Sequence, residues 1–533
     1  MRARAIMVLG TNSHVGKSLI TAALCRIFAQ QGYRVAPFKS QNMSLNSAAT
    51  VEGLEIGRAQ ALQAEAAGVA PSVDMNPILL KPAGGMTSQV VVRGRIWGKL
   101  SASDYHQRRV EELMPVVCES YEALAAQHEV IVLEGAGSPA EINLKHHDIV
   151  NMRMAELADA ACMLVGDIDR GGVFASLLGT IELLDHEEQA RIRGFLVNKF
   201  RGDLALLEPG IRMMEGRIQK PCLGVIPYLN QLMLEEEDTL GLPVIDSTDN
   251  TAWLSRTPDR ALRVAVVALP SFSNFTDFDA LRAEPSVTLR FCRSAAQLRQ
   301  ADIVILPGSK QTVDDLLWMR NEGLDRVLLD YARTGLIAGI CGGMQMLGEQ
   351  ILDPHGMETA GSILGLGLLA IHTTMQPCKT TSMATGQLVA HSLFGQPVPQ
   401  VHLKGYEIHI GETLYLKNAE PFAQLVRQLD SKQSPHLDGC MAPDTRIFGT
   451  YLHGLFDEDD FRHAFIAAAR NFYHLAPAVV LEQWKQKREA SLNRLAATVR
   501  ESLDMSTIFS WTGLAYKPSS TVESSLASEE KCH

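Results

Sequence analysis

Short apolar runs alternate along the chain with longer stretches of helical periodicity. In the first half these runs occupy residues 5–9, 130–133, 162–165, 195–197 and 224–226. A second series begins at residues 263–269 and continues through 303–306 and 336–340. Strands that alternate with helices in this way are typical of largely parallel sheets covered by helices. The pattern therefore predicts two different α/β domains.

The chain is too long for one hydrophobic core, because 533 residues compare with about 150 for an average domain. After residue 235 an acidic cluster leads into a polar, proline-containing stretch. This change predicts a linker at residues 236–260, between a first domain at 1–235 and a second domain at 261–510. The last residues are rich in Ser and Glu, so residues 511–533 are predicted to be a disordered polar tail.

Charge and composition argue against several classes of function. The net charge of −11 disfavours nucleic acid as a partner, because phosphate binding requires a basic face. No apolar run approaches the roughly 18 residues of a membrane span, and the short apolar N-terminus fits a first strand better than a secretory signal. Nine cysteines occur without a C-x-x-C pair, which favours reduced thiols over disulfides or structural zinc. We therefore predict a cytoplasmic protein with small-molecule partners, and neither nucleic acid nor a membrane among them.

The first apolar run leads into a sequence suited to binding phosphate, Gly10-Thr11-Asn-Ser-His-Val-Gly16-Lys17-Ser18. Glycine lets backbone N–H groups approach phosphate oxygens, and the N-terminus of the following helix adds partial positive charge. Lys17 would bridge the β- and γ-phosphates of a nucleotide, and Ser18 would ligate Mg²⁺. The loop is one residue longer than the usual G-x-x-x-x-G-K-[ST] pattern, so a strand–helix turn that binds nothing remains an alternative.

Three further strand ends in the first half carry polar side chains. They belong to Glu134, Asp169 and Asn198. Ligands of open α/β sheets bind at the carboxyl ends of the strands, so Glu134 is a candidate Mg²⁺ ligand. Asp169 could serve a metal or a substrate, and Asn198 could contact the nucleotide base. A solvated strand end with no such role remains the alternative for each.

The second half contains a candidate nucleophile, Cys341, in the sequence Gly-Ile-Cys-Gly-Gly-Met-Gln after a predicted strand. A sharp turn there would lift the thiol above the sheet, and the backbone N–H of Gly342 could help to form an oxyanion hole. His453 ends another strand about a hundred residues later, as a Cys–His pair requires. The loop at Gly308 could supply a second oxyanion donor. Taken alone, Cys341 and His453 each fit a buried structural residue, but together they favour nucleophilic catalysis.

These motifs resemble those of the cobyrinate and cobyrate amidotransferase family. The Pro-Gly-Ser, Gly-x-Cys-Gly-Gly and Thr-Tyr-Leu-His-Gly motifs are similar to class I glutamine amidotransferase domains. The phosphate loop and Glu-Gly-Ala-Gly are similar to dethiobiotin-synthetase-like ATPases. The resemblance covers residues 4–510. It implies an N-terminal P-loop domain with a parallel sheet, followed by a class I glutamine amidotransferase-like α/β domain.

Three segments resemble the cobyrate branch of this family more than its a,c-diamide branch, namely residues 37–46, 76–82 and 167–176. On this resemblance Lys39 would contact the nucleotide. Lys81, Asp148 and Asp169 would contact the substrate.

The chain also departs from the family's patterns. Residues 145–148 read Lys-His-His-Asp, where the family tends to have arginine. Class I glutaminases usually place a carboxylate two residues after the histidine, and here Leu455 stands in its place. The resemblance implies the same loss in the family, so we expect a Cys–His dyad whose histidine is oriented by a group that the sequence does not identify.

The resemblance also implies the reaction. Cys341, with His453 as base, would release ammonia from glutamine, and MgATP would activate carboxylates of a corrin for amidation. In the cobyrate branch these are the b, d, e and g carboxylates of adenosylcobyrinic acid a,c-diamide. A basic stretch of the first half consists of Lys81, Arg93, Arg95 and Lys99. It could attract such a polyanion, or it could be solvated surface. An enzyme of the a,c-diamide branch and a non-catalytic P-loop ATPase switch remain the alternatives, and no oligomeric state is predicted.

Overall fold

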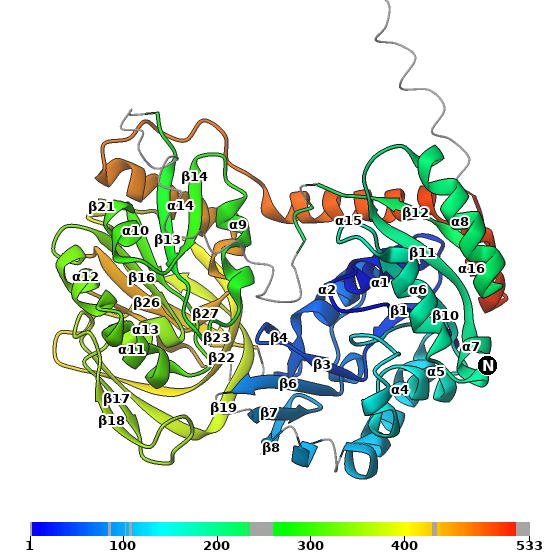
Figure 1. Cartoon of the computed structure of the whole chain (residues 1–533). Coiled ribbons are helices and arrows are strands. Elements are labelled where there is room, and N and C mark those ends of the chain that lie inside the picture. The colour runs from blue at the N-terminus through cyan, green and yellow to red at the C-terminus, as the bar shows by residue number, and fades with distance from the viewer. Residues whose placement is uncertain are drawn as a thin grey trace, which may run out of the picture.

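The residues that the computed structural model describes are 3–83, 87–101, 103–105, 109–230, 232–234, 259–428 and 434–518. Within them the chain forms two α/β lobes, here called the first and second domains, which meet along one side (Figure 1). Most of the predicted linker at 236–260 lies outside the described residues, as does the predicted tail from residue 519 onward. No helix in the described part of the chain is long and apolar enough to cross a membrane.

A six-stranded parallel sheet forms the core of the first domain. Its strand order is β12 (Cys222–Pro227), β11 (Ile192–Phe200), β10 (Ala161–Asp167), β1 (Arg4–Gly10), β9 (Val130–Glu134) and β2 (Val35–Phe38). The helices of this domain are α1 (Lys17–Gln30), α2 (Arg58–Ala67), α4 (Met114–Gln127), α5 (Met152–Leu157), α6 (Val173–Glu182), α7 (His186–Arg191) and α8 (Leu204–Ile218). The arrangement matches the predicted alternation, and it directs the carboxyl ends of the strands to one edge of the sheet.

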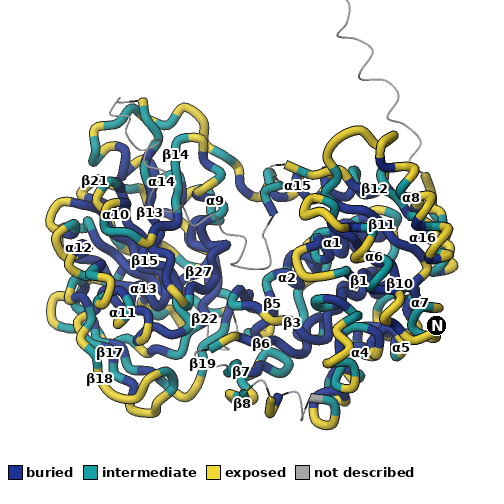
Figure 2. The backbone as a smooth tube through the Cα atoms, viewed as in Figure 1, coloured by how far each residue is buried: buried dark blue, intermediate teal, exposed yellow. Residues whose placement is uncertain are grey.

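The central strand β1 shows why both faces of this sheet are covered. Ile6 and Val8 pack with residues of α1 on one face, whereas Met7 and Leu9 belong to the apolar cluster on the other face. All four side chains are fully buried, and Figure 2 shows β1 as a buried strand inside the domain. A strand that is apolar on both faces must lie inside the sheet, and this places the loop that follows β1 at the centre of the ligand-binding edge.

Two smaller pieces of sheet extend from the first domain toward the second. One has the strand order β3 (Gln41–Met43), β6 (Ile78–Ala83), β7 (Thr87–Val92) and β8 (Arg95–Ser101). The other is a hairpin of β4 (Ser47–Ala49) and β5 (Glu55–Gly57), here called the interface hairpin. Strand β4 contacts β19 (Ile371–Leu388) and β22 (His402–Tyr415) of the second domain. The interface hairpin of the first domain therefore contacts the second domain directly.

The second domain is built on a sheet with the strand order β14 (Val287–Cys292), β13 (Leu262–Val267), β15 (Ile303–Leu306), β16 (Leu336–Ile340), β26 (Ile447–Thr450) and β25 (Cys440–Met441). All pairings are parallel except that of β25 with β26. Its helices are α9 (Asp279–Arg282), α10 (Ala295–Gln300), α11 (Thr312–Asn321), α12 (Leu324–Tyr331), α13 (Gly342–Leu347) and α14 (Asp459–Phe472). The carboxyl ends of β15, β16 and β26 thus lie next to one another.

A mixed sheet flanks this core. Its strands are β18 (Gly361–Leu364), β17 (Gln350–Asp353), β19, β22 and β27 (Leu452–His453), with β23 (Ala423–Arg427) and β24 (His436–Asp438) paired beyond β19. The short hairpin β20 (Ser392–Leu393) and β21 (Gln396–Pro397) stands apart from it. In the pairing of β22 with β27, Tyr406 lies opposite His453. The long strand β22 therefore runs past the candidate histidine.

The last two helices correct the predicted extent of the second domain. Residues up to 510 were expected in that domain, but α15 (Trp484–Ser502) only begins there, with Trp484 in the second domain's apolar cluster. The rest of α15 and α16 (Met505–Thr512) lie along the first domain (Figure 1). Leu492, Leu495 and Val499 are buried in the apolar cluster that contains α1. An apolar face predicts that a helix is buried, but it does not predict which domain the helix packs against.

The beginning of the predicted tail is also packed onto the first domain. Trp511, Leu514 and Tyr516 lie against the same apolar cluster. The hydroxyl of Tyr33 donates a hydrogen bond to the carbonyl oxygen of Ala515 over 2.7 Å. The described chain is therefore ordered through these residues, beyond the predicted boundary at 511.

Candidate active site

The loop between β1 and α1 closes around a glycine. Gly16 has a φ of 100°, in the left-handed region, and a Cβ there would lie 2.2 Å from Asn198 Nδ2. Asn198, near the end of β11, donates from this nitrogen to the carbonyl oxygen of Val15 over 2.7 Å. Only glycine fits such a close approach at this φ. Asn198 thus braces the loop, and the base contact predicted for it stays a prediction.

Lys17 reaches across the same loop from the first position of α1. Its ammonium group donates to the carbonyl oxygens of Asn12, at 2.9 Å, and Gly137, at 3.1 Å. Gly10 and Thr11 follow at the end of β1, where the Thr11 N–H donates to Val165 of β10. The residues predicted to hold phosphate therefore lie together at the carboxyl edge of the first sheet.

Glu134, at the end of β9, gathers several polar groups next to this loop. Its Oε1 accepts hydrogen bonds from Ser18 Oγ and Lys39 Nζ, both at 2.9 Å. Its Oε2 accepts one from Gln63 Nε2 at 2.6 Å. Glu134 is only 1% exposed, and a buried carboxylate is costly unless partners such as these satisfy its oxygens. The structure brings Ser18, Lys39 and Glu134 together and adds Gln63, which the sequence did not single out, while their metal and nucleotide roles stay predictions.

The oxygens of Ser18 and Glu134 fit a magnesium ion. Mg²⁺ in nucleotide sites commonly takes one or two protein oxygens, with phosphate oxygens and water completing an octahedron. Neighbouring ligands of such an octahedron lie about 3 Å apart, because each metal–oxygen bond is about 2.1 Å long. Ser18 Oγ and Glu134 Oε1 are separated by 2.9 Å. Both predicted metal ligands can therefore reach a single ion.

Cys341 occupies a strained turn between β16 and α13. Its φ of 51° and ψ of −109° are rare for a residue with a side chain. The Cys341 N–H donates to Thr450 of β26 over 2.8 Å, and a Cβ on Gly343 would lie 2.0 Å from the Leu306 carbonyl oxygen. The turn is thus held between two neighbouring strands. It has the geometry of the predicted nucleophile elbow.

His453 is oriented by a carboxylate that sequence analysis did not identify. Its Nδ1 lies 2.7 Å from Asp277 Oδ2, and Asp277 Oδ1 accepts a hydrogen bond from the Gly454 N–H at 3.0 Å. Asp277 lies on the 3₁₀ turn η6 (Phe275–Phe278), 176 residues before the histidine. An Nδ1–H that is held by a carboxylate leaves Nε2 available as a base. The arrangement is therefore Cys–His–Asp, in which Asp277 is the orienting group that the sequence did not identify.

The charges around His453 favour its protonated form. Burial alone would lower the pKa of the ring, because a charged imidazolium is poorly solvated inside the protein. The Asp277 carboxylate and Cys341 outweigh burial, and they raise the pKa of His453 to about 10. A protonated histidine stabilises a neighbouring thiolate, which is the nucleophilic form of cysteine.

The two predicted oxyanion donors border this pair. A Cβ on Gly308 would lie 3.2 Å from His453 Cε1, and a Cβ on Gly342 would lie 3.0 Å from the Ser309 nitrogen. The loop after β15 therefore lies directly against the turn that follows Cys341. The backbone N–H groups of Gly308 and Gly342 come from the two loops next to the thiol, and their role as oxyanion donors stays a prediction.

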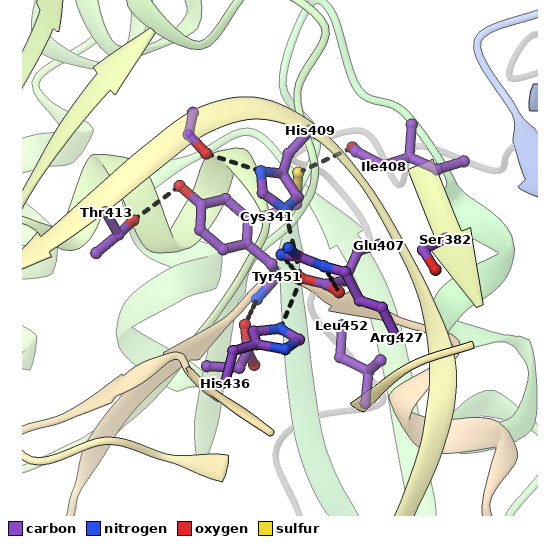
Figure 3. Close-up of polar contacts among 12 residues, drawn as sticks. Cys341, Ser382, Glu407, Ile408, His409, Thr413, Arg427, His436, Tyr451 and Leu452 are labelled. Carbon is purple, nitrogen blue, oxygen red and sulfur yellow. Dashed lines mark hydrogen bonds and ion pairs between the residues drawn. The ribbon is translucent and has the colours of Figure 1, made fainter. Parts of the chain in front are cut away.

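A pocket of about 520 Å³ is lined in part by Glu407, His409, Arg427 and Tyr451. Figure 3 shows these side chains gathered beside Cys341. The rings of His409 and Tyr451 are stacked, with centroids 3.8 Å apart. Glu407 and His409 lie on β22, Arg427 lies on β23, and Tyr451 stands in the Thr-Tyr-Leu-His-Gly motif. None of them was assigned a role from the sequence, because only the fold brings these segments together.

The pocket carries charges of both signs. Burial would raise the pKa of Glu407, but hydrogen bonds from His409, His436 and Arg427 lower it well below the usual range. Arg427 makes two of these bonds, at 2.8 and 2.9 Å. Glu407 is therefore ionised and paired with the Arg427 guanidinium, which suits a small ligand that carries charges of its own.

Lys81, predicted to contact substrate, is buried where the two domains meet. Its ammonium group donates to Glu55 Oε1 at 2.6 Å and to Ser47 Oγ at 3.0 Å. Glu55 Oε2 also accepts from Lys379 of the second domain at 2.5 Å. Burial would raise the pKa of Glu55, but the two lysines lower it well below its usual range. Lys81 thus takes part in a link between the domains, and its substrate role stays a prediction.

The other residues predicted to contact the substrate differ in exposure and in their hydrogen-bond and ion-pair partners. Asp148 accepts hydrogen bonds from the N–H groups of Val150 and Asn151, so it supports the turn before α5. Asp169 is exposed and pairs with Arg201 at 3.2 Å. The remaining members of the basic stretch are Arg93, which pairs with Asp74 at 2.9 Å, and Arg95 and Lys99, which are exposed on β8. Substrate contacts by these residues also stay predictions.

Comparison with known proteins matches each domain to a family. Residues 263–461 match the CobB/CobQ-like glutamine amidotransferase domain, and residues 6–240 match the CobQ/CobB/MinD/ParA nucleotide binding domain. The chain is 45% identical over 508 residues to the cobyric acid synthase of Thermoanaerobacter sp. (strain X514), with 95% of this chain and 98% of the relative covered. It is 46% identical over 516 residues to that of Clostridium acetobutylicum, with 96% and 99% covered.

The fold and the site define a glutamine-dependent amidotransferase that is joined to a nucleotide-binding P-loop domain. Both parts of the predicted fold class are confirmed by the two family matches. Because the similarity extends over nearly the whole length of the relatives, the chain belongs to the cobyric acid synthase family. It is therefore an enzyme of the cobyrate branch, as three segments of the sequence predicted.

Proposed function

We propose that this enzyme amidates the b, d, e and g carboxylates of adenosylcobyrinic acid a,c-diamide, with ATP, Mg²⁺ and ammonia from glutamine. The observation that carries the proposal is the pairing, in one chain, of Cys341 beside His453 with a phosphate loop beside Glu134. A carboxylate is a poor electrophile at neutral pH, so an amide-forming enzyme needs both an activating nucleotide and a nitrogen donor. The names of the relatives support a corrin acid as the substrate.

In the second domain Cys341 would attack the carboxamide carbon of glutamine. The backbone N–H groups of Gly342 and Gly308 would stabilise the oxyanion of the tetrahedral intermediate. His453 would give its Nε2 proton to the departing ammonia, leaving a glutamyl thioester on Cys341. It would then take a proton from the water that hydrolyses the thioester. Asp277 would keep the ring in the productive orientation during both steps.

The charged pocket beside Cys341 would hold the amino-acid end of glutamine. That end carries one ammonium and one carboxylate group. Arg427 offers positive charge, and Glu407 and Glu412 line the same pocket with negative charge. Complementary charge of both signs would fix the direction of glutamine and point its carboxamide toward the thiol.

In the first domain Lys17 would stabilise the charge that develops on the transferred phosphoryl group. Ser18 and Glu134 would hold Mg²⁺, which supplies neutralisation of phosphate charge when it is bound. Transfer of the γ-phosphoryl group to a substrate carboxylate gives an acyl phosphate. Ammonia then attacks the acyl carbon, phosphate leaves, and an amide is formed.

The test is to supply the adenosylated a,c-diamide with MgATP and amide-¹⁵N-glutamine, and to count labelled amides by mass spectrometry. The proposal predicts four labelled amides, each dependent on both ATP and glutamine. If the enzyme leaves the a,c-diamide unchanged and, with cobyrinic acid supplied in its place, adds two amides at the a and c carboxylates, it belongs functionally to the sister branch. Turnover of ATP without hydrolysis of glutamine would point to a P-loop switch.

The proposal also places the reaction in the cytoplasm, where ATP and glutamine are supplied. Its partners are then the corrinoid, glutamine and ATP. The net charge of −11 supports the prediction that nucleic acid is not among them.

A further inference from the structure

The interface hairpin of the first domain supports the turn that orients His453 in the second domain. Asn46, immediately before β4, accepts a hydrogen bond on Oδ1 from the Phe275 N–H at 3.2 Å. The N–H of Ser47 donates to Asn274 Oδ1 at 3.0 Å. Asn46, Ser47 and Asn274 are all buried. Two hydrogen bonds from one domain therefore hold the start of η6, the turn that carries Asp277 in the other domain.

Asn274 also touches the histidine itself. Its Nδ2 lies 3.4 Å from His453 Nδ1, on the edge of the ring that faces Asp277. Asn274 adopts a φ of 53°, a left-handed conformation that asparagine tolerates better than most residues. The bond from Ser47 fixes the direction of the Asn274 side chain in this conformation. A shift of the hairpin would therefore change the surroundings of the catalytic ring.

The hairpin also packs against the neighbours of Cys341. Ala49 forms a buried apolar cluster with Tyr406 and Ile408 of β22. The ring of Tyr406 is stacked on His453, with centroids 5.3 Å apart, and the carbonyl oxygen of Ile408 lies 3.7 Å from Cys341 Sγ. One element of the first domain thus contacts residues on both sides of the Cys–His pair.

The other end of the same segment reaches the phosphate site. Lys39 bonds to Glu134, and the chain reaches Asn46 seven residues later. Asn76 ties this segment to the hairpin, because its Nδ2 donates to the Lys39 carbonyl oxygen at 3.0 Å and its Oδ1 accepts from the Gly57 N–H at 3.2 Å. A displacement of Lys39 would therefore be transmitted to both ends of the hairpin.

We propose that Asn46 and Ser47 are positioning residues for glutamine hydrolysis, and that they couple it to occupation of the nucleotide site. They act through Asn274 and Phe275 on Asp277, and so on the orientation of His453. Glutamine is then hydrolysed fastest when the first domain holds its own substrates. The inference rests on the proposed function, because it requires Cys341 and His453 to hydrolyse glutamine.

The test uses the full-length enzyme with the substitution Asn46→Ala, which removes the acceptor of the Phe275 N–H. With MgATP and the corrin present, kcat for glutamine hydrolysis should fall about tenfold, as expected when a buried hydrogen-bonding group loses its partner. The KM for glutamine and the synthesis from free ammonia should stay within about twofold of wild type. Asn46→Asp keeps the acceptor oxygen and should restore most of kcat. The matched control is Glu52→Gln, an exposed position in the turn of the same hairpin, which should behave like wild type.

A second readout follows the thiol directly. The pH profile for alkylation of Cys341 by iodoacetamide reports the thiolate paired with His453. It should differ between wild type and Asn46→Ala, and the stimulation of glutamine hydrolysis by MgATP and the corrin should be smaller in the variant. If Asn46→Ala does not fold, Asn46→Leu takes its place, because leucine has nearly the shape of asparagine and no acceptor for the Phe275 N–H. That variant should lower the same kcat about tenfold.

Wild-type kcat and an unchanged alkylation profile in Asn46→Ala, or in Asn46→Leu where it stands in, would overturn the coupling while leaving the proposed function intact. Equal losses in glutamine-dependent and ammonia-dependent synthesis would also overturn it, since they would show a purely structural role in the first domain. A wild-type enzyme that hydrolyses no glutamine under any condition would overturn the proposed function itself.

Discussion

Replacing Asp277 with asparagine removes one charge and leaves the shape of the side chain nearly unchanged. The asparagine can still accept the Gly454 N–H, which now bonds to Asp277 Oδ1 at 3.0 Å. Its amide NH₂ would then face His453 Nδ1 and drive the ring proton to Nε2. A histidine protonated there cannot take a proton from a thiol or a water molecule. Asp277→Asn should therefore slow glutamine hydrolysis.

The size of the effect follows from the pKa of His453. The Asp277 carboxylate and Cys341 together raise it from 6.5 to about 10. Each pKa unit corresponds to about 1.4 kcal/mol, and both Cys341 and the opposing effect of burial enter the net rise, so we take about 3 kcal/mol as the order of magnitude of the carboxylate's contribution. Since about 1.4 kcal/mol is a factor of ten in rate, kcat should fall about a hundredfold.

The assay measures glutamate release from glutamine in the presence of MgATP and the corrin. Synthesis from ammonia, which bypasses Cys341, serves as the internal reference. Asp279→Asn is the matched control, because Asp279 lies two residues further along and pairs with Arg282 instead of the histidine. A loss in kcat of less than about threefold for Asp277→Asn would refute the role assigned to the carboxylate.

Three further outcomes are expected. Lys17→Ala should abolish synthesis from either glutamine or ammonia, measured as amide formed, because no acyl phosphate is made; near-normal ammonia-dependent synthesis would contradict the assignment of the phosphate loop. Leu495→Ala should lower the free energy of unfolding of the first domain by about 2–5 kcal/mol in urea denaturation, because Leu495 is buried in that domain's core; an unchanged midpoint would contradict the packing of α15. Folding raises the pKa of His453, so its contribution to stability is complete below pH 6.5 and is lost as the pH rises through about 10; wild type should therefore lose more stability over that range than His453→Gln, and parallel curves would contradict the ion pair.

The motifs that depend on a single turn could be predicted from the sequence. The phosphate loop and the nucleophile elbow each consist of a strand, a glycine-containing turn and a helix, so neighbouring residues determine their shape. The structure places Lys17 and Cys341 at the carboxyl ends of their strands accordingly. Glu134 could be predicted for the same reason, since parallel strand ends meet at one edge.

The groups that the sequence did not reveal depend on contacts between distant segments. Asp277 reaches His453 from 176 residues away, on a turn that no local pattern marks as catalytic. Lys81 was predicted as part of a basic stretch, but its partners are Glu55 and, through Glu55, Lys379 of the other domain. Helix α15 shows the same limit, because its apolar face could have packed on either domain. In each case the tertiary packing selects one partner among many that the chain could offer.

The division of labour between the two domains is tested most directly by Cys341→Ala, assayed for corrin amidation with glutamine and, separately, with a high concentration of ammonium at a pH where some NH₃ is present. The thiol is needed only to release ammonia, and the phosphoryl chemistry belongs to the first domain. Glutamine-dependent amidation should fall by several orders of magnitude, the scale seen when a catalytic nucleophile is removed, while amidation from ammonia should persist. Full glutamine-dependent synthesis by Cys341→Ala would show that the cysteine is structural, and would contradict the function assigned to the second domain.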